Sequence, residues 1–296
     1  MEIIKIIIYG ILEGITEWLP ISSTGHLILL KELMPLNISN EFWSLFEVII
    51  QLGAVLAVLV LYFNKLKPNK DNINTWKKII ISCIPATIIG LLFDDVFERY
   101  FYNKISVAIA LIIVGLLFII IEKNNNKNNI AQITYKSALI IGLSQVIAAI
   151  FPGTSRSGIT IITALILGIT REKATEFTFL MSIPVMIGAS LLKLIKFGFT
   201  FVNNEIFILL IGLLSAFITS LLVIKFLLNY IKKHDFSIFG VYRIILGIII
   251  LLSLVWKDLI WLMKLLLVMF AIIKLINYCI VQEIIVHIVC QVNILI

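Results

Sequence analysis

The sequence predicts an all-α polytopic membrane protein. Of its 296 residues, 61% are hydrophobic and 14% are charged, and the mean hydropathy is +1.11. Soluble domains are about 45–50% apolar and about 25% charged. A membrane-spanning helix needs about 20 mostly apolar residues, so this chain is long enough for several spans. The composition excludes a water-soluble globular domain and a disordered chain.

Six apolar stretches of near-spanning length are bounded by charged residues: 42–63, 79–93, 105–121, 177–192, 206–224 and 236–256. Two further apolar segments, 3–30 and 137–170, are interrupted by clusters of proline, glycine and hydroxyl residues. Non-helical backbone at membrane depth is tolerated only where protein covers it or where it lines a wet cavity. We therefore expect these two segments to be re-entrant helical hairpins.

The two hairpin segments resemble each other. Four residues of the first recur 132 positions later: Gly10, Ile15, Pro20 and Ser23 as Gly142, Ile147, Pro152 and Ser155. The same offset sets Glu13 opposite Gln145. We predict two repeats, residues 1–128 and 129–256, each with one hairpin and three spans. Because an odd number of spans inverts the second repeat, the functional site is expected between the broken helices.

Charged residues predict the orientation of the chain, whose net charge is +7. If residues 65–78 are cytoplasmic, alternating spans leave the acidic loop at 94–95 outside. The same alternation places the other basic loop residues on the cytoplasmic side: Lys123, Lys127, Lys136, Arg171, Lys173, Lys225, Lys232 and Lys233. This agrees with the positive-inside rule. The basic excess therefore records topology, and nucleic acid is not expected as a partner.

The remaining features exclude some kinds of site. Cys83, Cys279 and Cys290 are isolated and form neither a disulfide framework nor a thiolate zinc site. Residues 257–296 form a hydrophobic C-terminal extension outside the repeat. For this extension, additional membrane segments, an interfacial helix and a segment without a role in catalysis all stay open.

Carboxylates inside apolar segments are the first candidate functional groups. Glu13 and Glu17 are four residues apart and share one helical face. Glu47 and Gln51 form a second such pair within a predicted span. Acidic residues at membrane depth usually face a cavity and serve a function. The alternative is that Glu13 and Glu17 are solvated near the interface, and that Glu47 and Gln51 are an interfacial acid and a packing amide.

A hydroxyl cluster follows the first carboxylate pair. Ser22, Ser23, Thr24 and His26 come directly after the helix-breaking Pro20. A serine nucleophile needs a base within hydrogen-bond reach, which His26 or a nearby glutamate would supply. The alternative is that the serines only cap a helix.

A second cluster surrounds Arg156, the one charged residue between 137 and 170. A guanidinium beside the exposed amides of a helix start forms an anion site, and a phosphate or diphosphate is the expected ligand. The alternative is a structural ion pair between Arg156 and Glu13 or Glu17. The glycine and hydroxyl residues expected to assist are Gly153, Ser155, Ser157 and Thr160.

Three motifs, at 13–26, 46–53 and 152–160, resemble the bacterial undecaprenyl-diphosphate phosphatases, the bacitracin-resistance family. The resemblance extends over residues 3–255. It implies six spans and two re-entrant hairpins in an inverted repeat, in the bacterial cytoplasmic (inner) membrane, with the active site facing the outer side. The implied activity is hydrolysis of the C55 isoprenoid diphosphate to the monophosphate carrier used for cell-wall synthesis, which confers bacitracin resistance.

The resemblance also implies residue roles. Glu13 and Glu17 form the essential acidic pair and hold a divalent cation, magnesium or calcium, while Ser23 and His26 are catalytic. Phosphate is bound by Ser155, Arg156 and Thr160, with Gly153 and Ser157 beside them. The supporting residues are Ser22, Thr24, Glu47, Gln51 and Gln145. The expected partners are the lipid substrate and membrane lipid, and self-association as a homodimer is left open.

Two mechanisms and two rival functions follow from these residues. Ser23 attacks the terminal phosphorus, or water attacks it while Ser23 orients the water. Inverted repeats with broken helices are also a transporter architecture, so a flippase for polyprenyl phosphate or another anion is the main alternative. A structural membrane scaffold is a weaker one, because it leaves the intramembrane polar groups unexplained.

Overall fold

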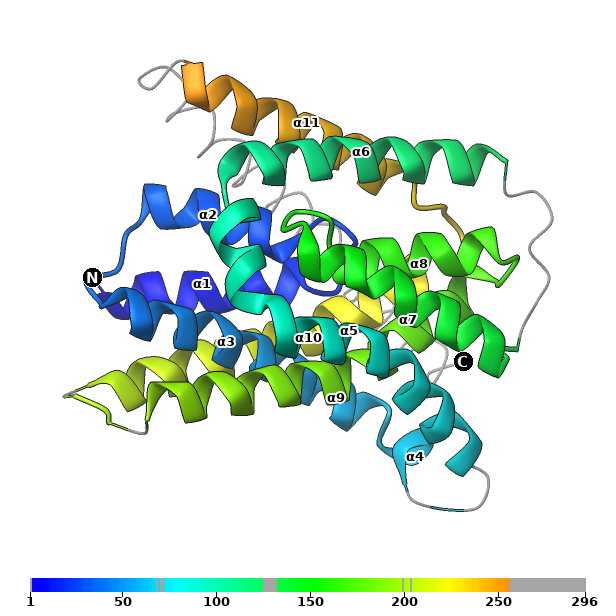
Figure 1. Cartoon of the computed structure of the whole chain (residues 1–296), viewed down its shortest axis with the longest axis horizontal. Helices are drawn as coiled ribbons and strands as arrows, with labels where there is room; N and C mark the ends of the chain where they lie inside the picture. The colour runs from blue at the N-terminus through cyan, green and yellow to red at the C-terminus, as the bar shows by residue number, and fades with distance from the viewer. Residues whose placement is uncertain are drawn as a thin grey trace, which may run out of the picture. The chain divides into compact units, whose positions relative to one another are not determined.

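The computed structural model describes residues 2–67, 69, 72–124, 132–198, 200–202 and 204–255 (Figure 1). Across these ranges the chain forms eleven α-helices and no β-strand, as the composition predicts. The helices are α1 Glu2–Thr16, α2 Ser23–Leu33, α3 Asn40–Leu61, α4 Phe63–Leu66, α5 Ile73–Phe101, α6 Lys104–Lys123, α7 Tyr135–Ile150, α8 Arg156–Ile166, α9 Arg171–Phe197, α10 Glu205–Tyr230 and α11 Ser237–Val255. Residues up to Leu251 form one compact unit. The predicted extension 257–296 lies outside the described residues.

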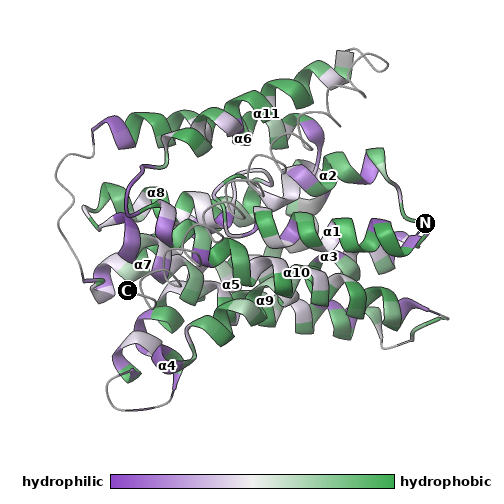
Figure 2. Cartoon of the chain, turned by 180° about the vertical axis from the view of Figure 1, so that it is seen from behind, coloured by the Kyte–Doolittle hydropathy of each residue, from purple (hydrophilic) through white to green (hydrophobic). Residues whose placement is uncertain are grey.

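Six of the described helices are long and apolar enough to cross a membrane, as predicted: α3, α5, α6, α9, α10 and α11. Their lipid-facing positions carry large exposed aliphatic side chains, such as Ile113 on α6 and Leu214 on α10. Figure 2 shows hydrophobic residues along these helices and hydrophilic residues around α4. The chain is therefore a multi-pass membrane protein.

Helices α1 and α2 form the first helical hairpin. The Lys5 ammonium donates a hydrogen bond to the Pro35 carbonyl (2.8 Å), and the Tyr9 hydroxyl donates to the Met34 carbonyl (3.1 Å). The start of α1 and the end of α2 therefore lie together. Between the helices, residues 17–22 form the first break, which contains Pro20 as the sequence predicts.

Helices α7 and α8 flank the second break, residues 151–155, which contains Pro152. The start of α7 lies beside the start of α5, where the Tyr135 hydroxyl contacts the Asn74 side chain. The open end of the first hairpin lies instead beside the start of α3, where the rings of Tyr9 and Trp43 are 5.1 Å apart. Helix α3 precedes α5 by one membrane crossing. The two hairpins consequently open at opposite ends of the unit.

Glycine allows each hairpin to pack closely against a spanning helix. A Cβ atom at Gly10 would lie 2.5 Å from the Gly212 carbonyl oxygen of α10, and one at Gly142 would overlap the Ser82 backbone of α5. Gly10 and Gly142 are one of the residue pairs of the predicted repeat. The absent side chains let the helix backbones touch, which fixes each hairpin on its supporting helix.

Helices α6 and α11 lie side by side, and α6 contacts both α2 of the first hairpin and α8 of the second (Figure 1). Leu29 of α2 packs in one buried cluster with residues of both helices: Val107, Ala108, Leu111, Leu246 and Ile250. This packing brings α11, the last described helix, against α2 near the beginning of the chain.

Ion pairs gather at the end of the unit where α4 lies. The Arg171 Nε atom donates to buried Glu122 (3.0 Å), and Lys65 and Lys173 both contact Glu176. These contacts join the end of α6 and the region of α4 to the start of α9. We refer to this end as the basic end.

Candidate active site

Glu17 links the two helix breaks. Its Oε2 atom accepts a hydrogen bond from the Ser23 hydroxyl (2.9 Å), and its Oε1 atom pairs with the Arg156 guanidinium (2.7 Å). The exposed fractions of the Glu17 and Arg156 side chains are 7% and 12%. The structure thus joins a carboxylate, a hydroxyl and a guanidinium, all of which the sequence singled out, in one largely dry network.

Further bonds hold this network in place. The Ser157 hydroxyl donates to the Glu17 carbonyl (3.2 Å), and Arg156 Nη1 donates to the Thr178 carbonyl of α9 (3.0 Å). Arg156 therefore makes the ion pair with Glu17 that the sequence offered as the alternative to phosphate binding. Among the described residues its buried Nε atom has no hydrogen-bond partner, so one nitrogen of the guanidinium is left without a partner.

Ser22 and Ser155 end the two breaks in the same way. Each is the N-cap of the following helix, with φ of 75° and 67°, and each side chain accepts a hydrogen bond from the amide three residues on. The predicted repeat paired Ser23 with Ser155. The structure instead gives Ser22 the conformation of Ser155, because the first break is one residue shorter after its proline. A positive φ is strained for a non-glycine residue and is typical of functional sites.

The first helical residues after these caps face the site. Ser23 begins α2 and Arg156 begins α8. Both helices therefore direct their free N-terminal amides toward the breaks, and these amides favour an anion. Hydroxyl, guanidinium and helix dipoles together suit a phosphate group.

His26 is held by both ring nitrogens. Its Nδ1 atom lies 2.7 Å from the Ser22 carbonyl, and its Nε2 atom lies 2.6 Å from the Tyr242 hydroxyl. A carbonyl only accepts, so Nδ1 carries the proton and a neutral ring accepts from Tyr242 at Nε2. Neither bond goes to Ser23. The candidate base that contacts Ser23 is Glu17.

Other predicted residues take different positions. The buried Thr160 hydroxyl donates to the Arg156 carbonyl (2.8 Å) and lies 3.1 Å from the Thr178 hydroxyl, so it braces α8 against α9. Glu13 and Gln145 are 0% and 3% exposed, and the structure describes no hydrogen-bond partner for either side chain. The unpartnered Glu13 oxygens are the candidate cation ligands.

Arg243 of α11 reaches both breaks, and the sequence analysis did not single it out. Its guanidinium donates to the carbonyls of Pro20 (3.1 Å), Gly153 (2.8 Å) and Thr154 (2.8 Å). The residue is fully buried. The available signal was an arginine inside an otherwise apolar predicted span, a position that usually has a function.

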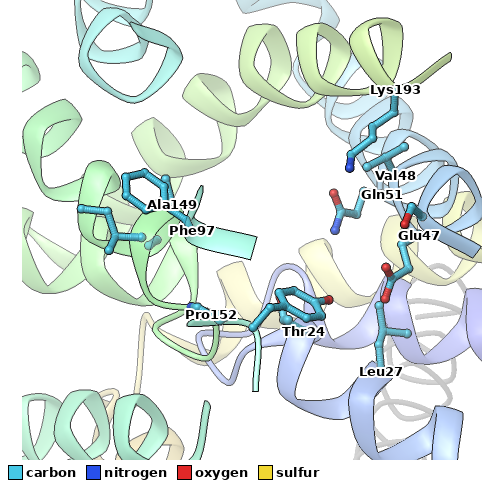
Figure 3. A pocket seen from close by; sticks show the side chains of 13 residues that line it. Thr24, Leu27, Glu47, Val48, Gln51, Phe97, Ala149, Pro152 and Lys193 are labelled. Atoms are coloured by element: carbon cyan, nitrogen blue, oxygen red, sulfur yellow. The ribbon is translucent and has the colours of Figure 1, made fainter. Parts of the chain in front are cut away.

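A cavity of about 220 Å³ lies beside the breaks (Figure 3). Thr24, next to Ser23, lines it together with Glu47, Gln51 and Lys193. Figure 3 shows Lys193 and Gln51 directed into the same space, facing Phe97 and Ala149 on its other side. The cavity is thus polar on one side and apolar on the other. The sequence singled out Glu47 and Gln51 but not Lys193.

These features define a helical multi-pass membrane protein with a buried carboxylate–hydroxyl–guanidinium site between two broken helices. The family described as bacitracin resistance protein BacA matches residues 6–249. The chain belongs to this family, as its motifs predict.

Curated relatives agree with this assignment. The chain is 58% identical to "Undecaprenyl-diphosphatase" of Desulfitobacterium hafniense over 266 residues, which are 85% of this chain and 96% of the relative. It is 57% identical to "Undecaprenyl-diphosphatase 1" of Clostridium acetobutylicum over 265 residues, 85% of this chain and 97% of the relative. It is 50% identical to "Undecaprenyl-diphosphatase" of Enterococcus faecalis over 268 residues, 85% of this chain and 97% of the relative.

Proposed function

We propose that the chain is an undecaprenyl-diphosphatase, which hydrolyses undecaprenyl diphosphate to undecaprenyl phosphate and inorganic phosphate. The product is the lipid carrier for cell-wall synthesis, and its regeneration confers bacitracin resistance. The names of the relatives support this function. The single observation that carries it is the bonding of Glu17 to Ser23 on one side and to Arg156 on the other.

In the proposed reaction Ser23 is the nucleophile and Glu17 is its base. As the Ser23 oxygen bonds to the terminal phosphorus, its proton passes to the Glu17 carboxylate, 2.9 Å away. The bond between that phosphorus and the bridging oxygen breaks, and undecaprenyl phosphate leaves with the electron pair. Water then attacks the phosphoserine, releases inorganic phosphate and restores Ser23.

Arg156 binds the diphosphate in this proposal. Phosphoryl transfer depends mainly on positioning and on stabilisation of charge. The guanidinium donors and the amides at the start of α8 offer that stabilisation around one residue. An arriving phosphate competes with Glu17 for the guanidinium, which frees the carboxylate to accept the Ser23 proton.

A divalent cation, magnesium or calcium, fits beside Glu13. The described residues contain no group of three or more His, Cys, Asp and Glu side chains placed to hold a metal ion. However, both Glu13 oxygens are buried without a partner among these residues, and magnesium is often held by one or two carboxylates plus substrate phosphates. When bound, the cation would neutralise charge on the diphosphate. Glu13 would hold it, since Glu17 is bonded to Ser23 and Arg156.

We infer that the two hairpins are re-entrant and belong to an inverted repeat. Their opening at opposite ends and their joining at Glu17 and Arg156 support this architecture. The cavity is lined by Tyr102 and Lys193, which lie near the ends of α5 and α9 away from the basic end. If the basic end is cytoplasmic, the cavity opens toward the outer face of the inner membrane and admits the diphosphate from there.

The test is phosphate release from purified protein in detergent, with a C55 or C15 prenyl diphosphate as substrate. The wild type should release phosphate although no second compartment is present; failure to do so would leave a transporter or flippase as the better reading. Ser23→Ala should lose at least about 100-fold in rate. Ser182→Ala is the matched control, because that buried hydroxyl donates to Phe179 within its own helix (2.6 Å).

Arg156→Ala should lose activity to a similar extent. Glu176→Ala, which removes an ion-paired residue at the basic end, should retain it. Mass spectrometry of acid-quenched enzyme should detect phosphorylated Ser23. Near-normal turnover of Ser23→Ala would instead assign the attack to water.

A further inference from the structure

Arg243 of α11 makes hydrogen bonds to both breaks. We infer that Arg243 is a positioning residue of the active site, which holds Ser23 and Arg156 in register with each other. This inference rests on the proposed function, because it assigns those two residues to the nucleophile and the phosphate site.

The contacts of Arg243 show what it fixes. Nη1 donates to Pro20 in the first break, and Nη2 donates to Gly153 and Thr154 in the second. All three acceptors are backbone carbonyls, so the guanidinium holds the backbone of the two breaks rather than a side chain. One rigid, planar group thereby ties two segments that are more than 130 residues apart in sequence.

The fixed carbonyls lie just ahead of the reacting groups. Thr154 directly precedes Ser155, the strained cap, and Arg156 is the next residue. Pro20 lies two residues before Ser22, the other strained cap, and Ser23 is the next residue. A strained backbone persists only where its surroundings over-determine it. The three hydrogen bonds supply that constraint to both breaks from one side chain.

The geometry indicates that Arg243 positions the backbone and does not bind the substrate. Both terminal nitrogens are bonded to carbonyls, and the residue is fully buried. Its Nε atom, like that of Arg156, has no hydrogen-bond partner among the described residues. Arg156, by contrast, is partly exposed and bonded to a carboxylate that can be displaced. The two arginines thus have different roles. Arg156 binds the anion, and Arg243 fixes the distance between Arg156 and Ser23.

Arg243→Lys is the informative variant. Lysine keeps the charge, but its single ammonium lacks the planar fork that reaches three carbonyls. Because nucleophile and phosphate site lie on different breaks, their misalignment slows the chemical step more than binding. We expect kcat to fall about 10–100-fold, while KM for the prenyl diphosphate changes by less than about threefold. Arg171→Lys is the matched control, since its ion pair with Glu122 lies at the basic end, and it should keep both constants within about threefold of wild type.

A double-mutant cycle separates positioning from general loss of structure. If Arg243 acts through the alignment of Arg156, the double variant Arg243→Lys/Arg156→Ala should be about as slow as Arg156→Ala alone. Full additivity of the two losses would overturn the inference, as would a kcat of Arg243→Lys within threefold of wild type.

Hydrogen exchange tests the same inference without activity. Peptides covering 17–25 and 151–159 should exchange faster together in Arg243→Lys, while peptides covering 104–123 should not change. Unchanged exchange in both breaks would overturn the inference even if the proposed reaction were not found. If the lysine variant does not elute as folded protein, Arg243→Gln is measured in the same way, with the same outcomes decisive.

Discussion

Replacement of Glu17 by glutamine tests the centre of the proposed mechanism. The amide has nearly the shape of the carboxylate, and its oxygen still accepts one hydrogen bond. It does not take up a proton from Ser23, and it no longer neutralises Arg156. Glu17→Gln therefore removes the base and the ion pair while it leaves the packing of the first break in place.

The structure allows an estimate of both effects of Glu17→Gln, the loss of reaction rate and the loss of stability. Loss of a general base slows a reaction about 10²–10⁴-fold, which corresponds to about 3–5 kcal/mol at 1.36 kcal/mol per tenfold. Breaking a buried ion pair from one side costs about 3–5 kcal/mol of stability. The two side chains are 7% and 12% exposed, so solvent screening is small. Because the amide oxygen still accepts from Arg156, we expect a stability loss near the low end, about 3 kcal/mol.

The assay is phosphate release from folded protein, with thermal unfolding measured on the same sample. Glu176→Gln is the matched control, since Glu176 pairs with Lys65 and Lys173 away from the breaks. It should keep kcat within about threefold of wild type. A similarly small effect in folded Glu17→Gln would refute the assignment of Glu17 as the base.

Further predictions concern the cation, the cavity and the helix contacts. Glu13→Gln should raise the magnesium or calcium concentration needed for half-maximal activity about tenfold or more, measured by titration of chelator-treated protein, because it removes the carboxylate that would hold the cation. Lys193→Met should raise KM about tenfold with little change in kcat, since a charged hydrogen bond is worth about 1.5 kcal/mol; the control Lys196→Met, an exposed lysine one turn further along α9, should leave KM unchanged. Gly142→Ala should destabilise the protein by about 1–3 kcal/mol through overlap with the α5 backbone, whereas Gly90→Ala, where a Cβ meets nothing within 4 Å, should be neutral or stabilising in a thermal unfolding measurement.

Hydropathy and helix breakers predicted most of the fold. The spans were located because apolar runs of this length have few alternatives, and the breaks were located by Pro20 and Pro152. The bounds of α5 differ most: the apolar run is 79–93, whereas the helix is Ile73–Phe101. Charged residues end an apolar run, but they do not end a helix, whose backbone hydrogen bonds form within the segment itself.

The candidate site was predictable where its residues belong to the motifs, and this includes the ion pair of Glu17 with Arg156 that the sequence offered as an alternative. Glu17 and Ser23 are six residues apart, and the sequence offered His26 or a nearby glutamate as the base for Ser23.

Tyr242 contacts His26, and Arg243 contacts Pro20. In each pair the two residues are more than 200 positions apart in the sequence. No local pattern links such positions, because the contact is created by the packing of α11 on α2. His26 is an example. Its position in the sequence suggested that it could be the base for Ser23, but in the structure its Nε2 atom is bonded to the Tyr242 hydroxyl.

The two breaks explain why an anion site and a buried arginine occur together. Each break brings the carbonyl end of one helix, α1 or α7, to the amide end of another, α2 or α8. Carbonyl ends carry partial negative charge and amide ends carry partial positive charge. Arg243 donates to backbone carbonyls within both breaks, those of Pro20, Gly153 and Thr154. The amide side is left to attract a ligand, and Arg156 adds a full positive charge where α8 begins. The same arrangement that makes a broken helix expensive within a membrane therefore prepares a site for a phosphate group.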